Sequence, residues 1–268
     1  MQVDRNRRRA PVPAPTQAVR PYSLLVVLNE SYRKFGTIFL NSLYRNANLS
    51  LIQRIYVGDV GLSAESRRFF QSYDKVEIID TKVNTDFIGI HADDWLRSVA
   101  VKSKLLLNLV QREQLPICMI DADCVVVRDF SHVLDESVDI QICQRNRRVR
   151  RRDGLVMKYI GSFLVVNSRR AVGFLEEWIR EIEHLYRIKA IPAHETPALC
   201  RTVERYRNEV RLGVLPEAAV SCDRACEEAT LVIHMKSNAA GAASAEESFQ
   251  KRVHAVRNYS GNKILTYL

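Results

Sequence analysis

The chain has 268 residues, of which 47% are hydrophobic, and this apolar content is enough to bury a large core, so a disordered protein is excluded for most of its length. The formal net charge of +9 indicates an anionic partner or substrate if the positive charges are clustered. No run of about 18 or more apolar residues occurs and no apolar segment follows the basic N-terminus, so we expect neither a membrane span nor a secretory signal.

The chain opens with MQVDRNRRRAPVPAPTQAVR, a basic and proline-rich segment that we expect to be a disordered tail over residues 1–20. The remainder, residues 21–268, is predicted to form a single α/β domain. Its first part alternates apolar runs of strand length with helical spacing of apolar residues. We expect strands at 22–29, 54–60 and 75–80 and helices at 35–48, 63–73 and 93–111.

The second part continues the alternation with a buried strand over PICMIDADCVVVRDF, residues 116–130. Further strands are expected at 138–144, 159–168 and 230–237, and helices at 170–187 and 244–259. Strands that alternate with helices favour a mostly parallel central sheet flanked by helices.

A second basic cluster, RNRRVRRR, occupies residues 145–152 and is predicted to be a solvated loop between two strands. A loop with six arginines in eight positions would also attract phosphate groups of a nucleotide, a nucleic acid or an anionic lipid surface. The run contains no aromatic residue and no nucleic-acid recognition motif accompanies it.

Six cysteines are scattered along the chain, and several lie within apolar runs. Free thiols behave there as small hydrophobic groups, so we expect all six to be reduced in a cytoplasmic protein. Cys222 and Cys226 form one CxxxC pair, which without a second pair is weak evidence for zinc.

Two carboxylates, Asp121 and Asp123, interrupt the apolar run at 116–130. On one strand they would point to the same side, at the edge of a parallel sheet where ligands bind. Two carboxylates at this edge are suited to holding Mg²⁺ or Mn²⁺ on a diphosphate. The alternative is that they cap a turn at the strand end.

The segment MIDADCVVVRDF resembles the Asp-x-Asp segment of GT-A fold nucleotide-sugar glycosyltransferases, especially the family 8-like enzymes. WLRSVAVKSKLLLNLV, GSFLVVNSRRAVGFLEEW and LVIHMKS are similar to other segments of these enzymes in the same order. The resemblance implies a GT-A fold, a UDP-sugar donor, Mn²⁺ or Mg²⁺, and transfer of a hexose to an acceptor with retention.

The same resemblance implies roles for individual residues. Asp121 would contact ribose and metal, Asp123 would chelate the metal, and His234 would be the third protein ligand. The residues expected at the donor are Leu28, Asn29 and Tyr32 at the base, Arg97 or Lys104 near phosphates or sugar, and Lys236 near the diphosphate. His194 and Glu195 are candidates for sugar contacts, and Asp121, Asp123 and Glu195 are the expected catalytic residues.

Other functions stay open at this point. The chain could be a nucleic-acid-binding or polyanion-binding protein that uses the arginine run, or a glycosyltransferase whose acceptor is nucleic acid. It could also be a GT-A domain that binds without catalysis. Each candidate ligand has an ordinary structural role as its alternative: a histidine satisfied at a strand end for His234, a helix cap for Glu195, and a charged helix face for Arg97 and Lys104.

Overall fold

The structure, a computed structural model, describes residues 20–82, 93–114, 116–150, 156–188, 195–222 and 230–234. Only the backbone is described at 93–99, 146–150, 216 and 221–222. Residues 1–19 of the tail expected at 1–20 lie outside the described residues, and so do the C-terminal helix expected at 244–259, Lys236 and His194.

The first half of the chain builds the parallel part of the main sheet. Its elements are β1 (Tyr22–Leu28), α1 (Arg33–Asn46), β2 (Ile52–Asp59), α2 (Ala64–Gln71), β3 (Val76–Asp80), α3 (Asp93–Arg112) and β4 (Ile117–Ile120). Strands β3, β2, β1 and β4 lie in this order and all run parallel. The order reverses at β1, so the carboxyl ends of β1 and β4 lie side by side at one edge.

The second half extends the sheet and adds a smaller one. Its elements are β5 (Cys124–Val126), β6 (Ile140–Arg150), β7 (Val156–Val166), α4 (Val172–Arg187), α5 (Glu195–Tyr206), β8 (Leu212–Pro216), β9 (Val220–Cys222) and β10 (Val232–His234). The seven-stranded sheet continues from β4 through β7, which is antiparallel to both of its neighbours, to β6 and then β8, which run parallel to each other. Strands β5, β10 and β9 form a three-stranded sheet. The expected mostly parallel α/β sheet is confirmed.

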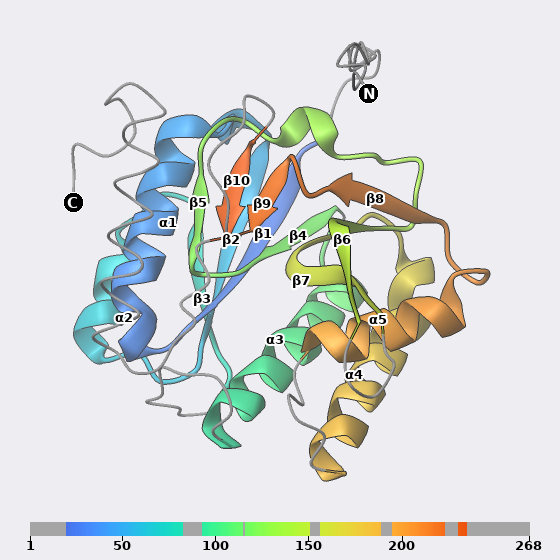
Figure 1. The fold of residues 1–268 in the computed structure, drawn as a ribbon. Helices are drawn as coiled ribbons and strands as arrows, with labels where there is room; N and C mark the ends of the chain where they lie inside the picture. The colour runs from blue at the N-terminus through green and yellow to red at the C-terminus, as the bar shows by residue number, and fades with distance from the viewer. Residues whose placement is uncertain are drawn as a thin grey trace, which may run out of the picture.

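Helices cover both faces of the main sheet (Figure 1), because its central strands are apolar on both faces. Along β1, Leu24, Val26 and Leu28 pack into a cluster with α1, α2 and the small sheet, whereas Leu25 faces a cluster with α3, α4 and α5. This alternation follows the two-residue period of a strand. The sheet is therefore the middle layer between two buried cores.

Two sequence predictions are corrected by the fold. The segment 116–130 is not one strand: β4 ends at Ile120, residues 121–123 form a turn, and β5 begins at Cys124 in the other sheet. Aspartate favours such turns, which explains the break. The arginine run is not a loop throughout, because residues 145–150 continue β6, and Val149 and Arg150 at its end pair with β7.

Candidate metal and donor site

The Asp-x-Asp segment lies in the turn that carries the chain from the large sheet to the small one. The backbone N–H of Asp121 donates to the carbonyl of Ser162 on β7 at 2.9 Å, and Cys124 N donates back to the Asp121 carbonyl at 3.1 Å. These two bonds hold the turn at the carboxyl end of β4. The aspartates therefore come together through a turn, and not through alternation along one strand.

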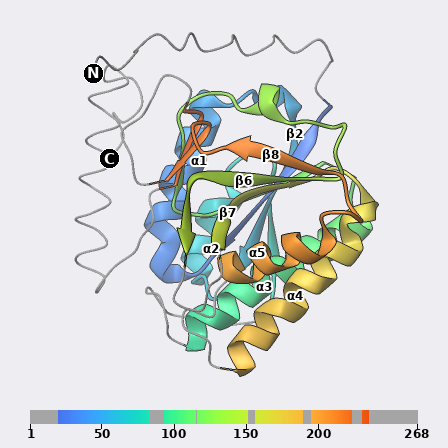
Figure 2. The ribbon, with the colours of Figure 1, turned by 45° about the vertical axis from the view of Figure 1, so that its right-hand side comes forward.

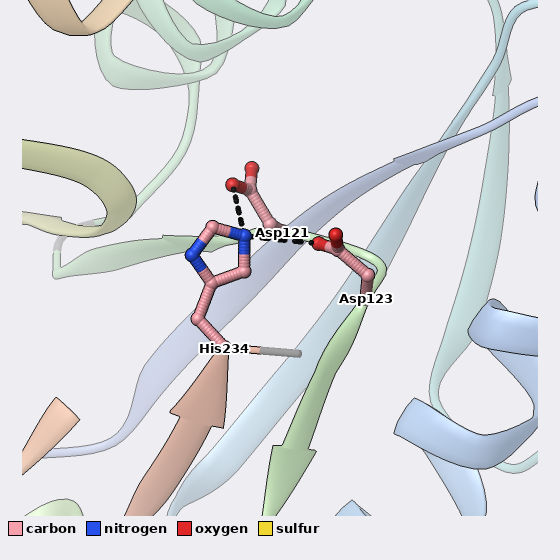
Figure 3. A group of neighbouring side chains, drawn as sticks. All are labelled: Asp121, Asp123 and His234. Atoms are coloured by element: carbon pink, nitrogen blue, oxygen red, sulfur yellow. Dashed lines mark ion pairs between the residues drawn. The ribbon is translucent and has the colours of Figure 1, made fainter. Parts of the chain in front are cut away.

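His234 is brought to the same place by the small sheet. It ends β10, and the antiparallel register pairs it with Cys124, the residue that follows Asp123. Its Nε2 lies 3.3 Å from Asp123 Oδ1 and 3.6 Å from Asp121 Oδ2 (Figure 3). One ligand atom from each of the three residues lies within 4.8 Å of the other two, and among the described residues no other group of this kind occurs.

The donor atoms of this cluster fit a divalent cation. Two carboxylates and one imidazole offer hard oxygen ligands and a nitrogen, a set that suits Mn²⁺ and is compatible with Mg²⁺. Asp123 is 7% exposed, and His234 is partly buried. Because like charges held together out of water repel, a bound cation would relieve the repulsion between the two carboxylates.

A lysine that the sequence analysis did not select completes the cluster. Lys102 on α3 is 7% exposed, and its ammonium contacts Asp121 Oδ1 and lies 2.8 Å from Glu195 Oε1. Burial acts to lower the pKa of Lys102, but the negative charges of Asp121 and Glu195 outweigh it and raise the pKa above its usual value. Lys102 is therefore a buried cation that connects the Asp-x-Asp turn to α5.

Glu195 begins α5 and faces this lysine with one oxygen only. Burial raises its pKa to about 7, the charge of Asp121 adds to the rise, and Lys102 opposes it. Its Oε2 is buried and has no hydrogen-bond partner among the described residues, and the same holds for Ser162 Oγ on β7. Buried polar atoms without partners are rare, and a ligand bound here would supply the missing partners.

Room for Glu195 depends on a glycine in β7. A Cβ on Gly161 would lie 3.0 Å from Glu195 Oε1 and 3.1 Å from its Cδ, closer than side chains normally approach. From the other side, Trp178 Nε1 donates to the Glu195 carbonyl at 3.1 Å. The carboxylate is thus held between β7 and α3, and the start of its helix is held by α4.

The residues expected at the nucleotide base lie at the adjacent strand end. Leu25 pairs with Met119, so Leu28 ends β1 close to the edge where Asp121 follows β4. Asn29 accepts the backbone N–H of Tyr32 at 2.9 Å and so caps the short 3-10 helix Glu30–Tyr32. The structure places all three residues at this edge and gives the side chain of Asn29 a local capping role.

Lys104 is not brought into the cluster. Its Nζ lies 2.7 Å from Glu183 Oε1 on α4, and both side chains are about half exposed. Residues two apart on a helix face nearly opposite directions, so Lys102 and Lys104 cannot share the site. The side chain of Arg97 lies outside the described part of the chain. The sequence contains a signal for Lys102, because positions 99, 102 and 106 follow helical spacing, which puts this lysine on the same face of the helix as Val99 and Leu106.

A search among solved structures finds glycosyltransferases. The chain is similar to LgtC in complex with donor and acceptor sugar analogs, with a TM-score of 0.52, 14% identity, and coverage of 85% of this chain and 95% of LgtC. It is similar to mouse xyloside xylosyltransferase 1, with a TM-score of 0.51, 13% identity, and coverage of 81% and 98%. The chain has the GT-A fold.

The chain is also similar to the bifunctional glycosyltransferase WbbM, with a TM-score of 0.52 and 13% identity. The match covers 81% of this chain but only 46% of WbbM, so this chain spans about half the length of that protein. No protein-family model matches the sequence, and no curated protein does. Within the GT-A fold of this chain, none of the helices that the structure describes has both the length and the apolar character needed to cross a bilayer.

Proposed function

We propose that the protein is a metal-dependent glycosyltransferase that moves a sugar, a hexose, from a UDP-sugar to an acceptor with retention of configuration. The observation that carries this proposal is the cluster of Asp121, Asp123 and His234 at the carboxyl edge of a GT-A sheet. The fold supports the class of reaction, and the ligand set supports the metal. Retention follows from the resemblance to family 8 enzymes.

Asp121, Asp123 and His234 would hold Mn²⁺ or Mg²⁺ in this proposal. The bound ion would neutralise charge on the donor diphosphate, which becomes more negative as the nucleotide departs. Lys102 fixes the rotamer of Asp121 through their direct contact and compensates one negative charge. The site is therefore held in place by an ion pair before a donor arrives.

Glu195 would contact the donor sugar. Its Oε1 is held by Lys102, whereas its buried Oε2 has no partner among the described residues and would accept a hydrogen bond from a sugar hydroxyl. A pKa raised to about 7 by burial also allows this carboxyl to hold a proton near neutral pH. These two properties support a catalytic role for Glu195 beside the aspartates.

The remaining donor contacts are proposed from position. Leu28, Asn29 and Tyr32 would lie at the base, and Arg97 and Lys236 at the phosphates.

The cysteines whose side chains the structure describes are Cys118, Cys124, Cys143 and Cys200. All four are buried, and none forms a disulfide. Buried unbridged thiols support a reducing compartment, and we propose the cytoplasm.

Thermal unfolding with Mn²⁺ and nucleoside diphosphates tests the proposal without knowledge of the acceptor. Wild type should be stabilised by Mn²⁺ and UDP together, by about 2.7 kcal/mol when ligand reaches about 100 times its dissociation constant. Asp123→Asn should lose this stabilisation, while the exposed control Asp74→Asn keeps it. A panel of UDP-sugars should then show slow Mn²⁺-dependent hydrolysis. Wild type that shows no metal-dependent shift with any nucleotide would overturn the metal proposal.

A further inference from the structure

Strands β6 and β7 continue past the site as a two-stranded ribbon. On β7, the pairing with β4 ends at Phe163 opposite Ile120, and the pairing of β6 with β8 ends at Gln144. Residues 156–160 of β7 therefore run on beyond the carboxyl end of β4, paired only with β6 in the described sheet. The five residue steps from Gly161 to Val156 span roughly 17 Å of strand.

Two irregularities bend this ribbon beside the site. The pair Ile142–Leu164 is followed by the pair Cys143–Ile160, so the two pairs are four residues apart on β7 but only one residue apart on β6. The pair Gln144–Tyr159 is followed by the pair Val149–Met157, so these pairs are five residues apart on β6 but only two residues apart on β7. Bulges bend strands and are common next to active sites. Figure 2 shows β6 bending where it runs beside β7.

The second bulge concentrates positive charge. Its residues 145–148 read Arg-Asn-Arg-Arg and lie opposite the single residue Lys158, and Arg150 follows one position beyond Val149. Neither β6 at 140–150 nor β7 at 156–166 contains an acidic residue. The Nε of Arg145 is buried and has no hydrogen-bond partner among the described residues. The two strands of the ribbon therefore contain no carboxylate that would neutralise their arginine and lysine side chains.

The root of the ribbon touches the proposed catalytic machinery. Gly161 and Ser162, in the first bulge of β7, contact Glu195 and Asp121 respectively. The sulfur of Cys200 on α5 donates to the Tyr159 carbonyl at 3.8 Å, so the helix that begins with Glu195 also supports the ribbon. A molecule bound along the ribbon would therefore have one end near the site.

We propose that this ribbon, residues 145–150 and 156–159, docks the acceptor, and that the acceptor is an anionic glycan. The inference rests on the proposed function and names the acceptor class for it. A glycan is favoured because a similar structure, LgtC, is described with an acceptor sugar analog. Arginine, whose planar fork matches carboxylate and phosphate groups, provides every cation of β6 in the ribbon.

Nucleic acid is disfavoured as the acceptor by the side chains of the ribbon. Single-stranded nucleic acid is held largely by bases stacked on accessible aromatic rings. Tyr159 is the one aromatic residue in ribbon segments 145–150 and 156–159, and it is 8% exposed. The described part of the ribbon therefore provides charge without a stacking platform.

Binding of labelled hexamers tests the proposal independently of activity. The probes are hexagalacturonate, phosphorylated maltohexaose, neutral maltohexaose and the hexanucleotide of deoxythymidine. The variant Arg147→Gln/Arg148→Gln/Arg150→Gln is compared with a control that loses the same charge from exposed helix ends, Arg112→Gln/Arg187→Gln/Arg207→Gln. Wild type should bind one or both anionic glycans, more weakly as salt rises, and the ribbon variant about tenfold more weakly than wild type at low salt. The control should stay within about twofold.

Equal losses in the two triple variants, or equal binding of neutral maltohexaose, would overturn the proposal. So would tighter binding of the hexanucleotide than of both anionic glycans. The last result would indicate a nucleic-acid acceptor. Comparison of hexagalacturonate with phosphorylated maltohexaose shows whether the ribbon prefers a glycan that carries carboxylates or one that carries phosphates. The Mn²⁺ and UDP thermal shift, measured on the same samples, separates the two proposals. A normal shift with no glycan binding overturns the ribbon alone, whereas glycan binding without a shift overturns the proposed function and supports the ribbon as a glycan site.

Discussion

Lys102 and Glu195 are separated by 93 residues, yet the ammonium of one lies 2.8 Å from a carboxylate oxygen of the other in a buried site. The same ammonium contacts Asp121. One cation from α3 thus holds the start of α5 and the end of β4 together. The site depends on this ion pair for its shape as well as for its charge.

Replacement of Lys102 by Met should be strongly destabilising, because it leaves the buried carboxylate of Glu195 and the partly buried carboxylate of Asp121 without a cation. Loss of one partner of a buried pair typically costs about 3–5 kcal/mol. Adding Glu195→Gln to Lys102→Met should recover part of this loss, since one uncompensated charge disappears. Urea unfolding of wild type, both single variants and the double variant measures the coupling. A Lys102→Met protein as stable as wild type would show that the pair contributes nothing.

Gly161→Ala should move Glu195 from its place. The added Cβ would lie 3.0 Å from Glu195 Oε1, and overpacking of this kind costs about 1–3 kcal/mol. Gly173→Ala is the matched control, because its Cβ would meet only Tyr206 Cε1, at 3.9 Å, and a helical position gains about 0.5–1 kcal/mol from alanine. The free energy of unfolding, measured with a chemical denaturant, and the rate of UDP-sugar hydrolysis should fall only for Gly161→Ala. If the two variants have equal stability and equal hydrolysis rates, the absence of a side chain at Gly161 is not needed to make room for Glu195.

His234→Ala should weaken Mn²⁺ binding less than Asp123→Asn does. A water can replace a neutral imidazole on an octahedral ion more readily than it can replace an anionic oxygen. A tenfold weaker affinity lowers the ligand-dependent stabilisation by about 1.4 kcal/mol. Melting curves at increasing Mn²⁺ with fixed UDP give the two affinities. A greater loss of Mn²⁺ affinity in His234→Ala than in Asp123→Asn would contradict this prediction.

Asp139 should make stability depend on pH. Its buried carboxylate accepts from Arg211 Nη2 at 3.0 Å and from the Arg211 backbone N–H at 2.9 Å, and the hydrogen bond from the Arg211 side chain lowers the pKa of Asp139. A lowered pKa contributes stability that is present above the unfolded value, about 3.9, and is lost as pH falls through the folded value.

Asp139→Asn should therefore be less stable than wild type near neutral pH, and the difference should shrink as pH falls below about 4. Urea unfolding of both proteins across this range measures it. A difference that stays constant with pH would mean that the ionised carboxylate is not the stabilising form.

Much of the fold follows from local pattern. The apolar run of β1 predicts a strand, because a strand that is buried on both faces is apolar at nearly every position. The helical spacing of apolar residues in α1 and α4 predicts both their type and their buried faces. The apolar run around Asp121 and Asp123 and the apolar residues before His234 mark these three polar residues as unusual by the same reasoning. Their assembly in space agrees with the sequence prediction, and their roles stay predictions.

Other features were decided only by the tertiary structure. The helical period of α3 shows that Lys102 lies on a buried face, but no local rule shows that Glu195 opposes it, since the contact joins segments 93 residues apart. The turn at 121–123 and the bulges of β6 and β7 depend on strands meeting in register. Sequence period determines which side of an element is buried. Packing between distant elements determines which charge meets which, and that is what forms the site.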